Sequence, residues 1–305
     1  MSFSNNFNND PNTYANIFSF MGFPLGRELD DSVDAVILGV PYDLATSGRS
    51  GTRYGPNGIR QASAQLRWEE KRWPWTFKLG DKLRCLDYGD VCFTDGDSED
   101  LVSELSETAD KIISANKTLL SLGGDHFLTL PLLRSVSKRY GPLALIHFDA
   151  HTDTEASDAK YNHGSMFYHA PKEGLIDCEH SIQVGIRTEY DYEQHPFQVL
   201  NASWVNEQDL GTVLKEIKQR VGNQPVYLSF DIDCLDPAFA PGTGTPVSGG
   251  LSADRALQIV RGLQDLNIVA ADVMEVAPAY DHAEITSLAA ATLTLELLHV
   301  IAAKR

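Results

Sequence analysis

The strongest constraint on the fold is an alternation of short apolar runs with longer segments of helical periodicity. The apolar runs lack the polar alternation of a half-exposed strand, which is typical of strands buried on both faces of a sheet. Five runs have this character: residues 35–38, 118–122, 143–148, 226–230 and 268–270. We therefore expect these runs to form strands in the interior of the protein.

Two segments between the runs have the three- and four-residue spacing of an amphipathic helix. Their apolar positions are Leu101, Leu105, Ala109 and Ile112 in one segment and Leu214, Ile217 and Val221 in the other. A third segment, 284–304, is apolar nearly all round and is expected to be a buried helix. Repetition of strand, helix and strand predicts right-handed βαβ units, and hence a mostly parallel sheet with helices on both faces.

The domain organisation follows from length and from the absence of linkers. A chain of 305 residues fits two average domains or one large α/β domain. No Gly/Ser run, Pro-rich stretch, charge block or internal repeat divides it. We expect a single α/β/α domain over residues 34–305, preceded by an irregular, Asn-rich arm at 1–33.

Charge and cysteine content indicate which partners and which cellular compartment to expect. The 25 Lys and Arg residues against 42 Asp and Glu residues give a net charge of −17, which argues against nucleic acid and anionic membranes. Four irregularly spaced cysteines suit neither a disulfide framework nor a zinc ribbon. The N-terminus lacks the features of a signal peptide, and no stretch approaches the roughly 18–20 uncharged apolar residues of a membrane span. A cytoplasmic protein with a small cationic partner is expected.

Three of the apolar runs are followed directly by residues that bind metals. Because parallel strands end at the same edge of a sheet, where ligands bind, these residues should meet. The sequence GGDH follows the run 118–122, DAHTD follows 143–148, and DID follows 226–230. The motifs supply six candidate metal ligands, namely His126, Asp149, His151, Asp153, Asp231 and Asp233.

Alternation along an extended chain is expected to turn the ligands of each motif to one face. Four aspartates on one face repel one another, and burying them requires compensating cations. A pair of divalent metals would supply that charge, and Asp and His donors suit Mn²⁺ or a similar ion better than a thiolate zinc site. The neighbouring Cys234 should face away and pack in the core. A lone DxD pair or a lone histidine often serves only a turn, but three such motifs together favour a dinuclear site.

These motifs resemble those of the ureohydrolases, the family of arginase and agmatinase. The likeness is carried by GGDH at 123–126, DAHTD at 149–153 and SFDIDCLDPAFAPGTGTP at 229–246, and it extends from about residue 34 to the C-terminus. The segments PYDLATSGRSGTRYGPNGIR, HGSMFYHAPKEGLI and EVAPAYD look like those of bacterial agmatinases. The resemblance implies a three-layer α/β/α sandwich around a mostly parallel eight-stranded sheet, assembled as a homotrimer or homohexamer.

The resemblance also implies how the ligands divide between two manganese ions. One ion would be held by His126, Asp149, Asp153 and Asp231, and the other by Asp149, His151, Asp231 and Asp233. Two metals about 3.5–4 Å apart can bridge a water molecule and lower its pKa toward neutrality. The bridging hydroxide is the expected nucleophile toward a guanidinium carbon.

Three further residues match the family's motifs. His163, in the sequence YNHG, matches a proton-shuttle histidine, and an imidazole pKa of about 6.5 suits that role. Glu275 follows the run of strand-forming residues at 268–274 and matches a carboxylate that binds the guanidinium through paired hydrogen bonds. Thr245, in a glycine-containing loop, is expected to contact the guanidino end. Taken alone, His163 could be an ordinary loop histidine and Glu275 a helix-start residue.

The expected substrate is agmatine, hydrolysed to putrescine and urea. The stretch TEASDAKYN at 154–162 lacks the Ser-Gly-Asn pattern with which arginase holds the amino acid end of arginine. Its acids Glu155 and Asp158 would repel an α-carboxylate, which agmatine does not have. Guanidinobutyrase and guanidinopropionase remain alternatives, because Lys160 or Arg49 could bind an acidic substrate.

Two other classes of function are weaker alternatives. A metal-dependent deacetylase-like amidohydrolase would use one zinc ion, which the six-ligand set disfavours. An inactive relative that serves as a binding partner would have damaged ligands, and none of the six is missing. The sequence therefore favours a metal-dependent hydrolase of a small cationic substrate.

Overall fold

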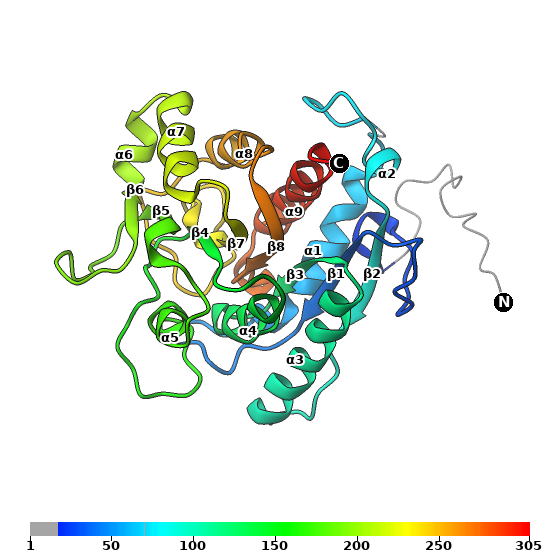
Figure 1. The fold of residues 1–305 in the computed structure, drawn as a ribbon, viewed down its shortest axis with the longest axis horizontal. Coiled ribbons are helices and arrows are strands. Elements are labelled where there is room, and N and C mark those ends of the chain that lie inside the picture. Colours follow the sequence, from blue (N-terminus) through cyan, green and yellow to red (C-terminus); the bar gives the residue numbers. More distant parts are fainter. Residues whose placement is uncertain (1–17, 70) are drawn as a thin grey trace.

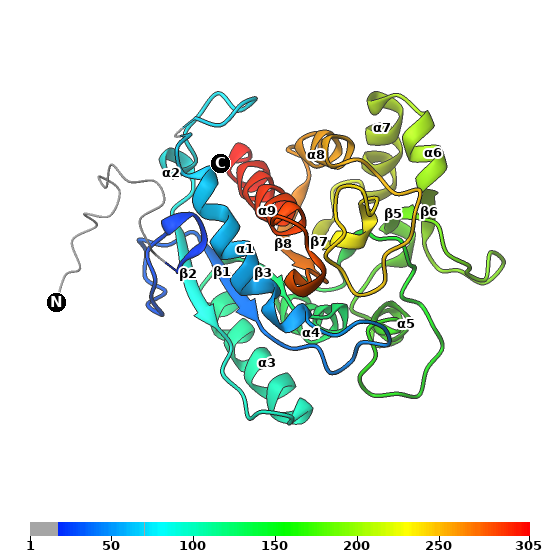
Figure 2. The same cartoon turned by 180° about the vertical axis from the view of Figure 1, so that it is seen from behind.

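The computed structural model describes residues 18–69 and 71–305. Within these residues, eight strands form one sheet in the order β2-β1-β3-β8-β7-β4-β5-β6. Every neighbouring pair is parallel. Figures 1 and 2 show the sheet from opposite sides, with helices on both of its faces. The expected three-layer α/β/α sandwich is therefore confirmed.

The strands differ in how clearly the sequence predicts them. They are β1 (Ala35–Val40), β2 (Cys85–Asp90), β3 (Thr118–Gly123), β4 (Ala144–Phe148), β5 (Ile182–Ile186), β6 (Gln198–Asn201), β7 (Pro225–Asp231) and β8 (Asn267–Met274). The five predicted runs correspond to β1, β3, β4, β7 and β8. The other three were missed because β2 and β6 are partly exposed edge strands and β5 carries the buried polar Gln183.

Nine α-helices cover the sheet within the described residues. They are α1 (Gly55–Ser63), α2 (Leu79–Lys82), α3 (Ser98–Ser114), α4 (Thr129–Tyr140), α5 (Met166–Lys172), α6 (Ala202–Glu207), α7 (Leu210–Val221), α8 (Ala253–Arg261) and α9 (Ile285–Ala303). The apolar sides of α3, α4 and α5 pack in one layer of the core, and those of α1, α7, α8 and α9 pack in the other. Asp97 begins α3 by accepting hydrogen bonds from two backbone amides of its first turn.

Helix α9 is the buried helix expected over 284–304. Its length and hydropathy are sufficient to cross a membrane, but 83% of the qualifying window is buried inside the protein. The helix contains the acidic Glu296, so it is not an uncharged stretch of the kind that the sequence was expected to lack. It is apolar nearly all round because it lies between α1 and α8, as Figure 2 shows.

The arm expected at 1–33 lies partly outside the described residues, which begin at Phe18. Within the described part, Phe20–Gly22 form a 3₁₀ turn and Leu25 makes an isolated bridge to Asp87. Phe20 is fully buried in the core, and its amide donates to the Asp87 carboxylate at 2.7 Å. The domain boundary at residue 34 stays a prediction, and Phe20 packs into the core from before it.

The buried carboxylate of Glu296 connects α9, through hydrogen bonds, to the loop that precedes α2. Glu296 is 0% exposed, and its carboxylate accepts from Arg72 Nε at 3.0 Å, Arg261 Nη2 at 2.7 Å and Trp75 Nε1 at 2.6 Å. The two arginine side chains are only 16% and 15% exposed. Arg72 has a second acidic partner in Glu69 at 3.1 Å, whereas Arg261 pairs only with Glu296 among the described residues, so its charge depends on Glu296 for compensation.

We predict that Glu296→Ala lowers the free energy of unfolding by about 3 kcal/mol, because it leaves the partly buried Arg261 without an ion-pair partner among the described residues and leaves Arg72 with only Glu69. Equilibrium unfolding in urea measures the change. Glu296→Gln keeps an acceptor but not the charge, and should lose less. An alanine variant that unfolds at the wild-type urea concentration would show that solvent already satisfies both arginines.

Candidate metal centre and active site

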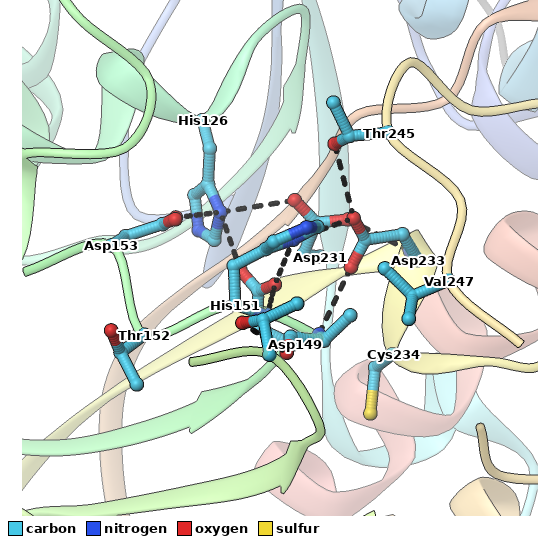
Figure 3. A network of polar contacts seen from close by, with 12 residues as sticks. His126, Asp149, His151, Thr152, Asp153, Asp231, Asp233, Cys234, Thr245 and Val247 are labelled. Atoms are coloured by element: carbon cyan, nitrogen blue, oxygen red, sulfur yellow. Dashed lines mark hydrogen bonds and ion pairs between the residues drawn. The ribbon is translucent and has the colours of Figure 1, made fainter. Parts of the chain in front are cut away.

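Four adjacent strands in the middle of the sheet carry the site residues at their carboxyl ends. In spatial order these strands are β3, β8, β7 and β4. They end next to His126, Glu275, the pair Asp231 and Asp233, and the loop 149–153, in that order. The structure therefore brings all six sequence-predicted ligands into one cluster, shown in Figure 3.

The first ligand group surrounds the ring of His126. Its Nδ1 atom lies 3.1 Å from each of three carboxylate oxygens. These oxygens belong to Asp149, Asp153 and Asp231. Metal–ligand bonds of about 2.1 Å place neighbouring ligand atoms of an octahedral site about 3.0 Å apart. One nitrogen and three oxygens at this spacing fit a single divalent ion.

A hydrogen bond on the far side of the His126 ring determines which ring nitrogen carries no proton. Ser229 Oγ donates to Asp272 Oδ1 at 2.7 Å, so its 2.8 Å contact with His126 Nε2 requires the histidine to donate. The proton on Nε2 leaves a lone pair on Nδ1. Within the described part of the chain, Nδ1 has no hydrogen-bond partner. A metal ion fits this arrangement, in which an outer hydrogen bond sets the ligand tautomer.

The electrostatics of the cluster also call for a cation. Burial disfavours a charge on His126, yet its carboxylate neighbours raise the pKa of the ring well above its usual value. Burial and the charges of Asp233 and Asp149 raise the pKa of Asp231 in the same way. Both shifts arise because too much negative charge shares a buried space. A divalent ion would neutralise it.

The second ligand group surrounds His151. Its Nδ1 atom lies 3.1 Å from Asp233 Oδ2 and 3.3 Å from Asp149 Oδ1. Asp149 uses its other oxygen, Oδ2, in the first group, so this carboxylate spans both groups. Asp231 differs because it forms no ion pair with His151 among the described residues, and its Oδ1 accepts from the Asp233 amide at 2.7 Å. A bridging role for Asp231 therefore stays a prediction.

The ligands meet for a reason other than strand alternation. β4 ends before Asp149, and the loop after it turns at Asp153, whose φ of 52° is left-handed. After β7, the residues Ile232–Cys234 form a 3₁₀ turn, which takes Asp233 out of the strand. The prediction that each motif is an extended segment was therefore wrong, although the residues it grouped do meet.

The site rests on a row of buried polar residues that crosses five strands at one register. Beginning at β3 and ending at β5, the row contains Ser121, Asp272, Ser229, His147 and Gln183. All five are 0% exposed. None of the five is among the site residues predicted from the sequence. A polar residue within an apolar run, such as Asp272 in IVAADVM, was the available signal.

His163 and Glu275 form a hydrogen-bonded pair beside the ligands, with His163 Nδ1 at 3.0 Å from Glu275 Oε1. Ser47 offers both kinds of partner to the other ring nitrogen, because its amide lies 2.9 Å and its hydroxyl 2.7 Å from Nε2. The Nε2 atom therefore has a partner with or without a proton. Burial alone would lower the pKa of His163, but the hydrogen bond and charge of Glu275 raise it to about 9.

Glu275 keeps one oxygen free although it is only 1% exposed. Its Oε1 also accepts from the His126 amide at 2.9 Å, whereas Oε2 has no hydrogen-bond partner among the described residues. The backbone holds this geometry at a left-handed φ of 64°. An unpaired buried carboxylate oxygen is costly, so it favours a cationic ligand.

A cavity of about 320 Å³ adjoins both ligand groups and His163. The described residues of its wall include four acids, Asp153, Glu155, Glu189 and Asp231, and no lysine or arginine. Thr245 lines the cavity and lies 3.4 Å from Asp233 Oδ2. Cys234 is buried, with its thiol 3.5 Å from the Val184 carbonyl, as its predicted packing role requires.

Comparison with known proteins identifies the family. The model of the arginase family matches residues 33–299. The chain belongs to the arginase family. Among the relatives of this arginase-family protein, an agmatinase from Serratia proteamaculans is 57% identical over 297 residues, which are 97% of each chain. An agmatinase from Edwardsiella ictaluri has the same identity and coverage.

Solved structures of similar proteins share the whole fold with this arginase-family chain. A hypothetical agmatinase from Burkholderia thailandensis is 51% identical, with a TM-score of 0.92 over 95% of this chain and 92% of the other. The proclavaminate amidino hydrolase of Streptomyces clavuligerus is 38% identical, with a TM-score of 0.91 over 96% and 100%. The ureohydrolase resemblance is therefore confirmed.

We predict that two aspartate substitutions remove different amounts of metal. Asp149→Ala should lose both ions because its carboxylate spans both groups, whereas Asp153→Ala should lose about one of two because it contacts only the first. Metal analysis of dialysed, folded protein measures the content per chain. Loss of both ions from each variant, or of one from each, would contradict the division of ligands described here.

Proposed function

We propose that this arginase-family protein hydrolyses agmatine to putrescine and urea. The observation that carries the proposal is an acidic cavity, without lysine or arginine among its described wall residues, next to two groups of metal-binding side chains. Agmatine is positively charged at both ends and meets four acids but no lysine or arginine among the described residues there. The relatives that are named agmatinases support the same substrate.

The two cations that could have bound an acidic substrate are engaged elsewhere. Lys160 forms an ion pair with Glu99, and the guanidinium of Arg49 lies over the ring of Tyr280 at 5.1 Å. Neither side chain lines the cavity. An acidic guanidino compound would therefore bring its carboxylate toward Glu155 and Glu189 without a counter-charge. This argues against the guanidinobutyrase and guanidinopropionase alternatives.

We propose that the resident metals are two Mn²⁺ ions held by the six ligands. Four carboxylates and two imidazoles suit this ion. The carboxylate of Asp149, which spans both groups, supports two ions over the single zinc of a deacetylase-like enzyme. When bound, such a metal pair lowers the pKa of water and supplies hydroxide at neutral pH.

The chain's own residues would orient the substrate and move a proton. The free Oε2 of Glu275 would accept from the guanidinium and hold its carbon over the ligand groups. Thr245 would contact the same end of the substrate. His163, charged below a pH of about 9, would give its Nε2 proton to the departing amine. Ser47 would then donate its amide hydrogen to the vacated nitrogen.

Assembly and location are part of the same proposal. Large exposed apolar side chains, including Trp68 at 68% and Trp73 at 74%, favour contacts between subunits of a homotrimer or homohexamer. All four cysteines are free, as the cytoplasm would keep them. We further propose that residues 34–305 form one domain, because the sheet runs continuously through them.

We predict that agmatine is the preferred substrate by a wide margin. With Mn²⁺ present, kcat/KM for urea release from agmatine should exceed that from arginine or 4-guanidinobutyrate by about 100-fold or more. The reason is that each of these two compounds would place its carboxylate next to the acidic side chains of the cavity. A colorimetric urea assay with the three compounds decides this. Faster release from either acid would overturn the substrate assignment.

We also predict an alkaline limit to activity set by His163. The raised pKa keeps the ring protonated up to a pH of about 9, so kcat for agmatine should persist through pH 8 and fall above about 9. His163→Phe should lower kcat by about 100-fold or more and remove this ionisation. The partly exposed His180, whose ring pairs with Asp177 and does not line the cavity, serves as a control, and His180→Asn should leave the profile unchanged. A wild-type profile that falls already between pH 6 and 7 would exclude His163 as the proton donor.

A further inference from the structure

Gln183 lies at the centre of a hydrogen-bond network behind the metal-ligand loop 149–153. It is fully buried on β5, directly opposite His147 of β4 in the sheet register. Its Nε2 lies 2.7 Å from the Thr152 carbonyl and 2.9 Å from His147 Nδ1. Its Oε1 lies 2.7 Å from His195 Nε2. These contacts use both amide hydrogens and one oxygen lone pair.

The Thr152 carbonyl determines how the whole network is oriented. A carbonyl can only accept, so the amide nitrogen of Gln183 must face it. The second hydrogen of that nitrogen points at His147 Nδ1, which must therefore accept as well. His147 then carries its proton on Nε2 and donates it to Asp149 Oδ2 at 2.8 Å. A backbone carbonyl thus determines the tautomer of His147 through one side-chain amide.

This tautomer decides the role of His147. By position alone, His147 could join His126, Asp149 and Asp153 as a metal ligand. The proton on Nε2 excludes that, because the nitrogen that faces the cluster has no free lone pair. His147 instead donates to Asp149 from behind. Its ring is held in place by Phe167, whose centroid lies 4.5 Å away.

Gln183 therefore holds the loop at two points. Through His147 it orients Asp149, the carboxylate that spans both ligand groups. Through the Thr152 carbonyl it fixes the backbone between His151 and Asp153, the other two ligands of the loop. One buried amide thus connects to all three ligands that follow β4.

We propose that Gln183 and His147 are positioning residues that keep the loop 149–153 in its metal-binding geometry and keep His147 itself out of the coordination shell. The proposal rests on the metal centre proposed above, but not on the identity of the substrate. Outer hydrogen bonds to metal-binding carboxylates commonly contribute about 10–100-fold to metal affinity.

Two variants of His147 test the proposal. His147→Phe preserves the ring but removes the donor, and should weaken Mn²⁺ binding by about 10–100-fold. His147→Gln can place an amide N–H near the same position, and should recover most of that loss. Competition with a chelator of known Mn²⁺ affinity measures binding to metal-depleted protein, and thermal unfolding of the same samples measures stability. Equal Mn²⁺ affinities in the wild type and in His147→Phe would overturn the proposal, as would glutamine binding no better than phenylalanine.

Gln183→Met and His195→Phe form a second, matched pair. Gln183→Met removes both donors to the loop and should weaken Mn²⁺ binding at least as much as His147→Phe, whereas His195→Phe removes only the outer bond and should change it less than about threefold. Equal losses in the two variants would contradict a role centred on the loop. If Gln183→Met does not fold, the His147 pair still decides the question. A wild-type protein that binds no Mn²⁺ would instead refute the metal centre, which is a separate result.

Discussion

The repulsion among buried carboxylates is the constraint on which the rest of the structure depends. Asp149, Asp153, Asp231 and Asp233 share one space, and no arginine or lysine among the described residues forms an ion pair with their carboxylates. Such a cluster is tolerable only with metal ions or with protons in their place. The two ligand histidines and the free oxygen of Glu275 lie beside these carboxylates and contribute to the charge of the same cluster. The acidic cavity extends the negative electrostatic potential of this cluster toward solvent, where the potential attracts cations.

The scaffold makes this concentration of charge possible by keeping it at one edge. The four central strands are apolar through most of their length and are covered by helices on both faces. Core packing therefore holds them in place independently of the site residues. Each ligand is the last residue of a strand or lies a few residues beyond its end. The left-handed backbone conformations of Asp153 and Glu275 lie beyond the ends of β4 and β8, after this rigid support.

Sequence reasoning predicts the parts of this arrangement that are local in the chain. The motifs GGDH, DAHTD and DID each contain their own ligands, and the strand before each motif is a recognisable apolar run. The partners of His126 and His147 are not local: Ser229 and Gln183 come from other strands, and only the sheet register places them. Edge strands such as β2 also lack a signal, because partial exposure breaks their apolar pattern. Without the order of the strands, the residues behind the metal ligands could not be predicted.

The row of buried polar residues also affects which alignment of neighbouring strands is stable. A strand that is apolar on both faces carries little information about its alignment with a neighbour, since a slip of one residue exchanges one apolar side chain for another. Asp272 changes this, because it accepts from Ser229, Tyr227 and Thr129 only in the native alignment. A shifted β8 would bury this carboxylate among apolar groups without partners. The polar row that supports the metal site thus also penalises misaligned versions of the sheet, so that catalytic geometry and folding specificity depend on the same side chains.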